Sequence, residues 1–76
     1  MTSLADLKLG QRATVKQITH GALYSRLIEM GCLPGESIQL SKTAPMGCPL
    51  AITIAGYELS LRRDEAAFVL IEVTAN

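Results

Sequence analysis

The stretch LYSRLIEMGCLPG, residues 23–35, holds the one convincing helical spacing of apolar residues in this 76-residue chain. Leu23, Leu27 and Met30 recur at i, i+4 and i+7, so they share one face of a short helix. Gly31 follows, and a glycine at this point ends a helix in the left-handed conformation without strain. The Pro-Gly pair after it favours a turn. The stretch therefore predicts a helix, a stop, a turn and the start of a strand.

The predicted helix is too short to be stable alone, because helix nucleation costs more than a few hydrogen bonds return. The face that carries Leu23 must therefore dock on a small sheet formed by the rest of the chain. Tyr24 and Ile28 lie on a neighbouring face at i, i+4. We expect these two residues, together with Met46 at a loop tip, to contact a partner, because an exposed methionine adapts to varied surfaces. The alternative for these residues is ordinary surface exposure or overlap with the core.

Length and composition predict a single packed domain over residues 1–76. The chain is 49% hydrophobic, which favours a core over disorder. Lys+Arg and Asp+Glu number 7 each, so the net charge is zero, and no basic stripe marks a surface for nucleic acid. We therefore expect no nucleic-acid partner.

The same sequence predicts a cytoplasmic protein. No apolar run approaches the ~20 residues of a membrane span, and the N-terminus has neither the basic nor the apolar region of a secretory signal. Cys32 and Cys48 form no CxxC pair and supply no disulfide framework, which favours a reducing compartment. We expect no direct membrane insertion, so any contact with a membrane goes through a protein partner. The sequence leaves the oligomeric state open.

Five short strands are predicted from β-branched and alternating runs. They cover residues 11–19, 37–41, 50–54, 57–61 and 68–73. In the first run Val15 and Ile18 fall out of period two, so a bulge between them would return both to the inner face. Residues 55–56 are typical of a hairpin turn, and residues 62–66 of a polar turn. This spacing indicates a mostly β fold, a partly open barrel with few exposed edges.

Apolar residues outside the alternating runs complete the predicted core. Leu4, Leu7 and Leu9 would plug one end of the barrel, and the run that contains them begins as a single helical turn. Phe68, at the start of the last strand, is also assigned to the core. The sequence therefore predicts a small interior closed by leucines near the N-terminus.

Four segments of the chain resemble the FeoA family. Residues 26–35, RLIEMGCLPG, are similar to its RL..MG..PG core, and residues 44–50, APMGCPL, to its AP.G.P loop. Residues 56–62, GYELSLR, resemble its G..L.LR hairpin, and residues 66–73 resemble its final strand. The four motifs occur in order over nearly the whole chain. The resemblance implies an SH3-like β-barrel with the helix inserted between the first two strands.

The resemblance also implies a function. Stand-alone members of the FeoA family are small cytosolic accessory proteins of bacterial ferrous iron uptake, and they act with the FeoB permease, which carries a cytosolic GTP-binding domain. We therefore expect a protein that binds and modulates a permease of the FeoB type through its cytosolic part. The same domain type ends iron-dependent repressors, and the family is associated with transition metals. A metal-binding or metal-sensing domain is therefore the alternative.

The sequence offers no clear catalytic, cofactor or metal site. His20 is the only histidine and is expected in a loop, without the neighbouring groups that nucleophilic catalysis needs. Asp64 and Glu65 stand beside two arginines and indicate a solvated charged turn. Neither glycine-rich phosphate motif is present, and Cys32 and Cys48 lack the closely spaced partner ligands of a structural zinc site. We therefore expect no enzyme activity, no cofactor and no specific metal site.

Overall fold

Residues 2–19, 21–46 and 48–74 are described by the structure, which is a computed structural model. They form one six-stranded antiparallel sheet in the order β1-β6-β2-β3-β4-β5. The strands are β1 (Thr2–Ser3), β2 (Arg12–Ile18), β3 (Ser37–Thr43), β4 (Leu50–Ile54), β5 (Tyr57–Leu61) and β6 (Val69–Val73). The helices are the 3₁₀ turn η1 (Leu4–Asp6), α1 (Gly21–Glu29) and α2 (Arg63–Ala66).

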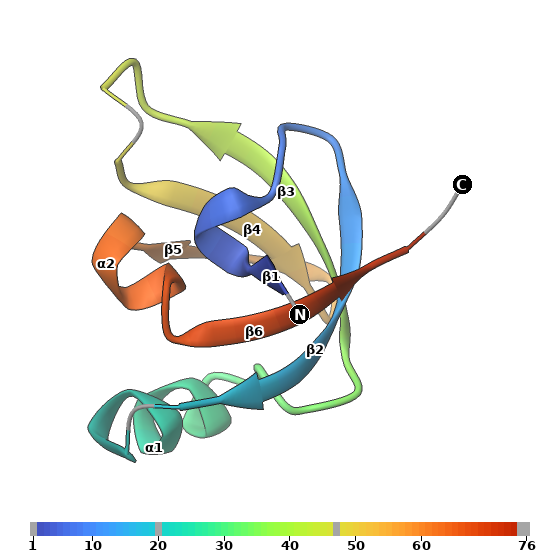
Figure 1. Ribbon diagram of the computed structural model, residues 1–76, viewed down its shortest axis with the longest axis vertical. Helices are drawn as coiled ribbons and strands as arrows, with labels where there is room; N and C mark the ends of the chain where they lie inside the picture. The colour runs from blue at the N-terminus through green and yellow to red at the C-terminus, as the bar shows by residue number, and fades with distance from the viewer. Residues whose placement is uncertain (1, 20, 47, 75–76) are drawn as a thin grey trace.

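The sheet curls into a barrel that stays open, because β1 and β5 lie at opposite ends of the strand order and do not pair. Figure 1 shows the strands wrapping around a common interior, with α1 at the lower end of the molecule and η1 across the strands. Among the described residues no polar or charged residue is buried, so the interior is apolar throughout. The predicted fold class, mostly β and partly open, is confirmed.

Six strands form where the sequence predicted about five. The additional strand is β1, whose Thr2 and Ser3 pair with Ile71 and Leu70 of β6. Two residues are too few to show a period of two, so no pattern in the sequence marks them as a strand. The predicted polar turn at residues 62–66 contains the short helix α2. The predicted helix lies between β2 and β3, the first two long strands.

The predicted bulge in β2 is present. The register of β2 against β6 shifts between Val15 and Gln17, which pair with Ile71 and Leu70. Because the shift adds one residue to β2 only, Val15 and Ile18 both turn inward and are 0% and 7% exposed.

Helix α1 docks on the open barrel through the predicted leucines. Leu23 and Leu27 are 7% and 0% exposed and join the core cluster, while Met30 is half-buried and packs against it. Cys32 is fully buried in the same cluster. The apolar stripe of α1 therefore completes the barrel interior, as the i, i+4, i+7 spacing predicted.

Two residues that the sequence assigned to the core are exposed. Leu9 is 65% exposed and Phe68 is 41% exposed, so both assignments were wrong. Leu9 lies in the turn before β2, where Gly10 adopts a φ of +82° and reverses the chain; Leu4 and Leu7 alone fill that end. Phe68 lies in the turn between α2 and β6, one residue before the paired strand begins.

The end of α1 is fixed by a Schellman motif. Gly31 has a φ of +88°, its N–H donates to the carbonyl of Ile28 (3.0 Å), and the N–H of Cys32 donates to the carbonyl of Leu27 (2.8 Å). A Cβ atom at Gly31 would collide with the hydroxyl oxygen of Tyr57, which comes from β5. The backbone conformation therefore favours glycine at this position, and a larger residue would also displace the tip of the Tyr57 side chain.

Truncating Leu27 should destabilise the fold strongly. Leu27→Ala removes a fully buried side chain and leaves a cavity between α1 and the barrel, so we expect a loss of about 2–5 kcal/mol in the free energy of unfolding. Tyr24→Ala is the matched control on the same helix, because Tyr24 is 44% exposed, and it should cost less than about 1 kcal/mol. Urea denaturation of both variants measures the two values. Equal losses would mean that α1 does not dock through Leu27.

Candidate partner-binding surface

Helix α1 presents two flanks on either side of its buried stripe. Arg26 lies on one flank and lines a pocket together with Met30, which follows the helix, and residues of β5. Tyr24 and Ile28 lie on the opposite flank, because residues four apart share a face of a helix. Tyr24 is 44% exposed and Ile28 is half-buried. The structure thus brings these two predicted partner residues together.

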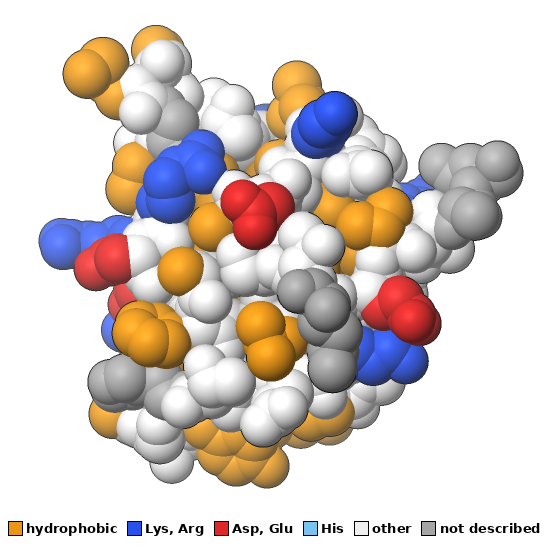
Figure 2. Space-filling view, in the orientation of Figure 1, with side chains coloured by type: hydrophobic (Ala, Val, Ile, Leu, Met, Phe, Trp, Pro, Cys, Tyr) orange, Lys and Arg blue, Asp and Glu red, His pale blue; other side chains and the backbone are white. Residues whose placement is uncertain are grey.

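Met46, the third predicted partner residue, lies elsewhere. It is 92% exposed, in the loop between β3 and β4. Figure 1 places this loop and α1 at opposite ends of the molecule. In Figure 2 hydrophobic side chains gather at the lower edge of the visible face, over α1, and again at its upper left tip, with charged side chains between them. The predicted partner residues therefore lie on two separate parts of the surface, Tyr24 and Ile28 on α1 and Met46 in the β3–β4 loop.

The flank of α1 that carries Arg26 borders two pockets that the sequence did not predict. The first, which we call the Phe68 pocket, measures about 400 Å³ and is lined by Ala22, Leu23, Arg26, Asp64, Glu65 and Phe68. The second, the α1–β5 pocket, measures about 440 Å³ and is lined by Arg26, Met30, Pro49, Ser60, Leu61, Arg62 and Glu65. Arg26 and Glu65 line both, so their ion pair stands between the two pockets.

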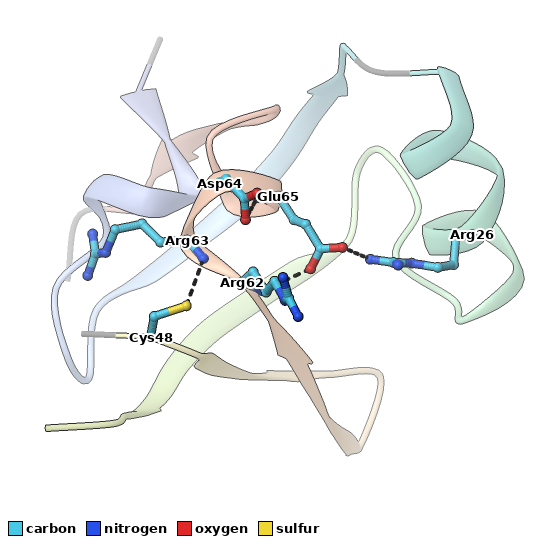
Figure 3. A network of polar contacts seen from close by, with 6 residues as sticks. All are labelled: Arg26, Cys48, Arg62, Arg63, Asp64 and Glu65. Carbon is cyan, nitrogen blue, oxygen red and sulfur yellow. Dashed lines mark hydrogen bonds and ion pairs between the residues drawn. The ribbon is translucent and has the colours of Figure 1, made fainter. Parts of the chain in front are cut away.

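Glu65 joins α1 to α2. Its carboxylate forms an ion pair with the guanidinium of Arg26, and its Oε1 accepts a hydrogen bond from the backbone N–H of Arg62 (2.9 Å). Figure 3 shows Arg26 reaching across from α1 to this carboxylate. The bonds from the Arg62 N–H and from Arg26 favour the charged form, so they hold the pKa of Glu65 below its usual value. An exposed pair of this kind orients the helix more than it stabilises the fold.

A second set of contacts holds α2 in place. The backbone N–H of Arg63 donates to Cys48 Sγ (3.4 Å) before β4, and the Arg63 guanidinium Nη1 donates to the carbonyl oxygen of Ala5 in η1 (2.8 Å). Figure 3 shows Cys48 and Arg63 on the side of α2 away from α1. Helix α2 is therefore tied to the N-terminal turn as well as to α1, and it forms a fixed wall of both pockets.

The described residues offer no metal centre. Among them no three His, Cys, Asp or Glu side chains lie close enough together to hold a metal ion. Cys32 and Cys48 are both free, and burial together with the charge of Glu36 raises the pKa of the Cys32 thiol to about 11, which keeps it protonated and unreactive at neutral pH. His20, the remaining candidate ligand, lies outside the described residues.

Sequence reasoning missed the Arg26–Glu65 pair and both pockets. The two residues are 39 positions apart, and only the wrapping of the barrel brings α2 beside α1. Arg26 does stand between Ala22 and Met30 at i−4 and i+4, a spacing that marks a common flank but gives no sign of what that flank faces. A partner 39 residues away leaves no local signal.

An open, six-stranded antiparallel barrel with one helix docked across it defines a small SH3-like β-domain. The family model described as FeoA domain matches residues 2–73. The chain belongs to the FeoA domain family, which is linked to ferrous iron transport. Within the described part of the chain, no helix has both the length and the apolar character needed to cross a bilayer.

A relative in Porphyromonas gingivalis joins two parts in one chain. It is named Fe(2+) transport protein A/Fe(2+) transporter FeoB fusion protein and is 31% identical over 74 residues. The match covers 96% of this chain and 9% of that protein. This chain therefore spans only a small part of the fusion protein's length.

Solved structures show the same fold. The solution structure of the FeoA protein from Chlorobium tepidum has a TM-score of 0.92 at 31% identity and covers 97% of this chain and 71% of that one. The FeoA of Stenotrophomonas maltophilia, a prokaryotic SH3 domain protein complexed with zinc, has a TM-score of 0.82 at 28% identity, covering 95% and 91%. The manganese regulator SloR, at 16% identity and a TM-score of 0.83 over 96% of this chain and 34% of that one, shares the fold alone.

Replacing Glu65 should remove a pH-dependent part of the stability. Because the pKa of Glu65 is lowered on folding, its contribution is present above the pKa of an unfolded glutamate and is lost as the pH falls through the folded value. The free energy of unfolding of Glu65→Gln should therefore lie below that of the parent near neutral pH, and the two should converge as the pH falls through the folded pKa of Glu65.

Thermal unfolding from pH 7 to about pH 3 measures this convergence. Arg26→Gln is the control, because it removes one donor and leaves the Arg62 N–H bond, so part of the pH dependence should remain. A gap between Glu65→Gln and the parent that stays constant over the whole range would contradict the assignment.

Proposed function

We propose that this protein binds the cytosolic part of a FeoB-type membrane permease and modulates its transport of ferrous iron. The observation that carries the proposal is the fusion protein of Porphyromonas gingivalis, in which a segment 31% identical to this chain is continuous with an FeoB transporter. Covalent linkage raises the effective concentration of two modules, which favours their association without any new contact. A separate chain needs a binding surface of its own to achieve the same association.

The proposed mechanism is a shift between conformations of the permease. A bound domain changes the activity of its partner only when it prefers one of the partner's conformations. This role needs recognition and no chemistry of its own, and GTP binding would belong to the permease. We propose that the protein acts in the cytoplasm, because the part of the permease that it would bind lies there.

The exposed flank of α1 is the proposed contact. Tyr24 offers a large ring with a polar tip, and Ile28 stands half-buried beside it. Aromatic side chains are enriched in protein interfaces, and a partner typically covers about 800 Å² of each surface. Against a total accessible surface of 4487 Å², such an interface would extend well beyond these two side chains. Met46, at the other end of the molecule, is a separate second contact in this proposal.

Capture of the intact permease tests the proposal. A FeoB-type permease from the same organism, in lipid nanodiscs, should bind the immobilised domain, and the affinity should differ with and without GTP. Tyr24→Ala combined with Ile28→Ala should keep the fold and weaken binding at least about tenfold. Met46→Ala should weaken it independently. Leu9→Ala is the matched control, because Leu9 is 65% exposed in the turn before β2, and binding should change by less than about twofold.

Two results would contradict the proposal at different levels. A permease that does not bind the parent domain with or without GTP would remove the proposed function. Unchanged binding by the Tyr24 and Ile28 double variant would leave the function and remove the proposed surface.

A metal-binding role is the second candidate, favoured by the zinc complex of the Stenotrophomonas maltophilia relative. Calorimetric titration with zinc and with ferrous iron separates the two roles. Stoichiometric sub-micromolar binding that is lost in His20→Ala or Cys48→Ala would support the metal role, whereas millimolar binding unaffected by these changes would leave the permease proposal alone.

A further inference from the structure

Strand β5 is the long unpaired edge of the sheet. β4 lies on one side of it, and β1 and β5 are the two ends of the strand order; β1 has only two residues. The two-residue turn at 55–56 makes Ile54 and Tyr57 the bonded pair that closes the hairpin. Bonded and non-bonded pairs alternate, so the N–H and C=O groups of Glu58 and Ser60 point away from β4. Outside the helices and strand ladders, no backbone hydrogen bond in the described ranges involves Glu58 or Ser60.

The α1–β5 pocket lies at this edge. Ser60 and Leu61, the last two residues of β5, line it together with Arg62 after this strand and Pro49 before β4, so it lies at the C-terminal end of β5. The opposite wall is α1, through Arg26 and Met30. At the other end of β5, the Tyr57 hydroxyl lies beside Gly31, just after α1. The pocket is therefore a slot between an unpaired strand and a helix.

The charged residues that line the slot, Arg26, Arg62 and Glu65, give it a net positive charge. Of the charged residues that line it, Arg26 and Glu65 neutralise each other in their ion pair. Arg62 lines the pocket as well, is exposed, and forms no ion pair with any residue in the described ranges. A carboxylate on an incoming segment would therefore meet a guanidinium at the end of β5, and guanidinium groups bind carboxylates through two parallel hydrogen bonds.

We propose that the slot between β5 and α1 binds an extended segment of the permease as an additional β-strand. Glu58 and Ser60 would supply two N–H donors and two C=O acceptors to the added strand. An apolar side chain of the segment would occupy the α1–β5 pocket between Met30 and Leu61, and an acidic side chain would pair with Arg62. In recognition of this kind, main-chain hydrogen bonds provide the affinity and pockets for side chains provide the specificity. The inference rests on the proposed function and adds a second surface to it.

A single segment fits this slot better than a second copy of the domain. Strands in a sheet lie about 4.8 Å apart, so a second copy pairing through its own β5 would also need room for its β4, at about twice that distance from β5. An isolated segment brings no second strand with it. The occupant we infer is therefore an extended, partly acidic stretch from the cytosolic part of the permease.

Peptide titration tests the inference on the full chain. Overlapping peptides of about ten residues that cover the cytosolic part of the permease are added to the ¹⁵N-labelled protein. At least one peptide should bind, and it should slow hydrogen exchange at the amides of Glu58 and Ser60 by about tenfold or more at saturation. The amides of Leu59 and Leu61, which already bond to β4, should change far less.

Two variants sharpen the test. Arg62→Glu should weaken binding of that peptide at least about tenfold, whereas Arg12→Glu, a change at another exposed arginine, on β2, should alter it less than about twofold. Ser60→Pro should abolish binding, because proline removes an edge donor that β4 does not use. The fold of each variant is checked by its amide spectrum, and Arg62→Glu keeps the test decisive if Ser60→Pro does not fold.

Several outcomes would overturn the inference. It fails if no peptide slows exchange at Ser60, if a peptide acts only on the Tyr24 flank, or if Ser60 is already protected in a concentration-dependent dimer. Capture of the intact permease equally by the parent, Arg62→Glu and folded Ser60→Pro would remove the slot as a binding site and leave the proposed function standing. Failure to capture the permease with the parent chain would remove both.

Discussion

The structure depends on the docking of one short helix over an open barrel. Leu23 and Leu27 bury the apolar stripe of α1 in the same core cluster that the strands line, and nine helical residues would not persist in water without that burial. The barrel needs the helix equally, because its first and last strands in the sheet order do not meet. Helix and sheet thus complete one interior, and neither is a separate unit.

The same docking shapes the surfaces that we propose for binding to the permease. Once the stripe of α1 is buried, Tyr24 and Ile28 are left on one flank, and Arg26 is directed towards Glu65 on the other. The Schellman end at Gly31 leaves room for the Tyr57 hydroxyl of β5 beside the end of α1. The slot that we propose as a binding site lies beside an unpaired strand, and one of its walls depends on how α1 is held.

The sequence predicted the features that depend on residues close together in the chain. Gly31 and the bulge after Val15 were predicted because a left-handed stop and a break in period two are visible within a few residues. Phe68 was wrongly assigned to the core because it is the last residue of the turn, directly before β6 begins. The ends of helices and strands are the part of an element that a sequence predicts least well. The Arg26–Glu65 pair escaped prediction because it joins residues 39 positions apart that only the completed barrel brings together.

Native-state hydrogen exchange tests the central claim most directly. If α1 is an integral part of the core, the amides of Leu27 and Ile28 will exchange only through global unfolding, with the free energy and denaturant dependence of the Val15 amide in β2. Exchange of the α1 amides through a local opening, several kcal/mol lower and nearly independent of denaturant, would contradict it, because the helix would then leave the barrel without unfolding it.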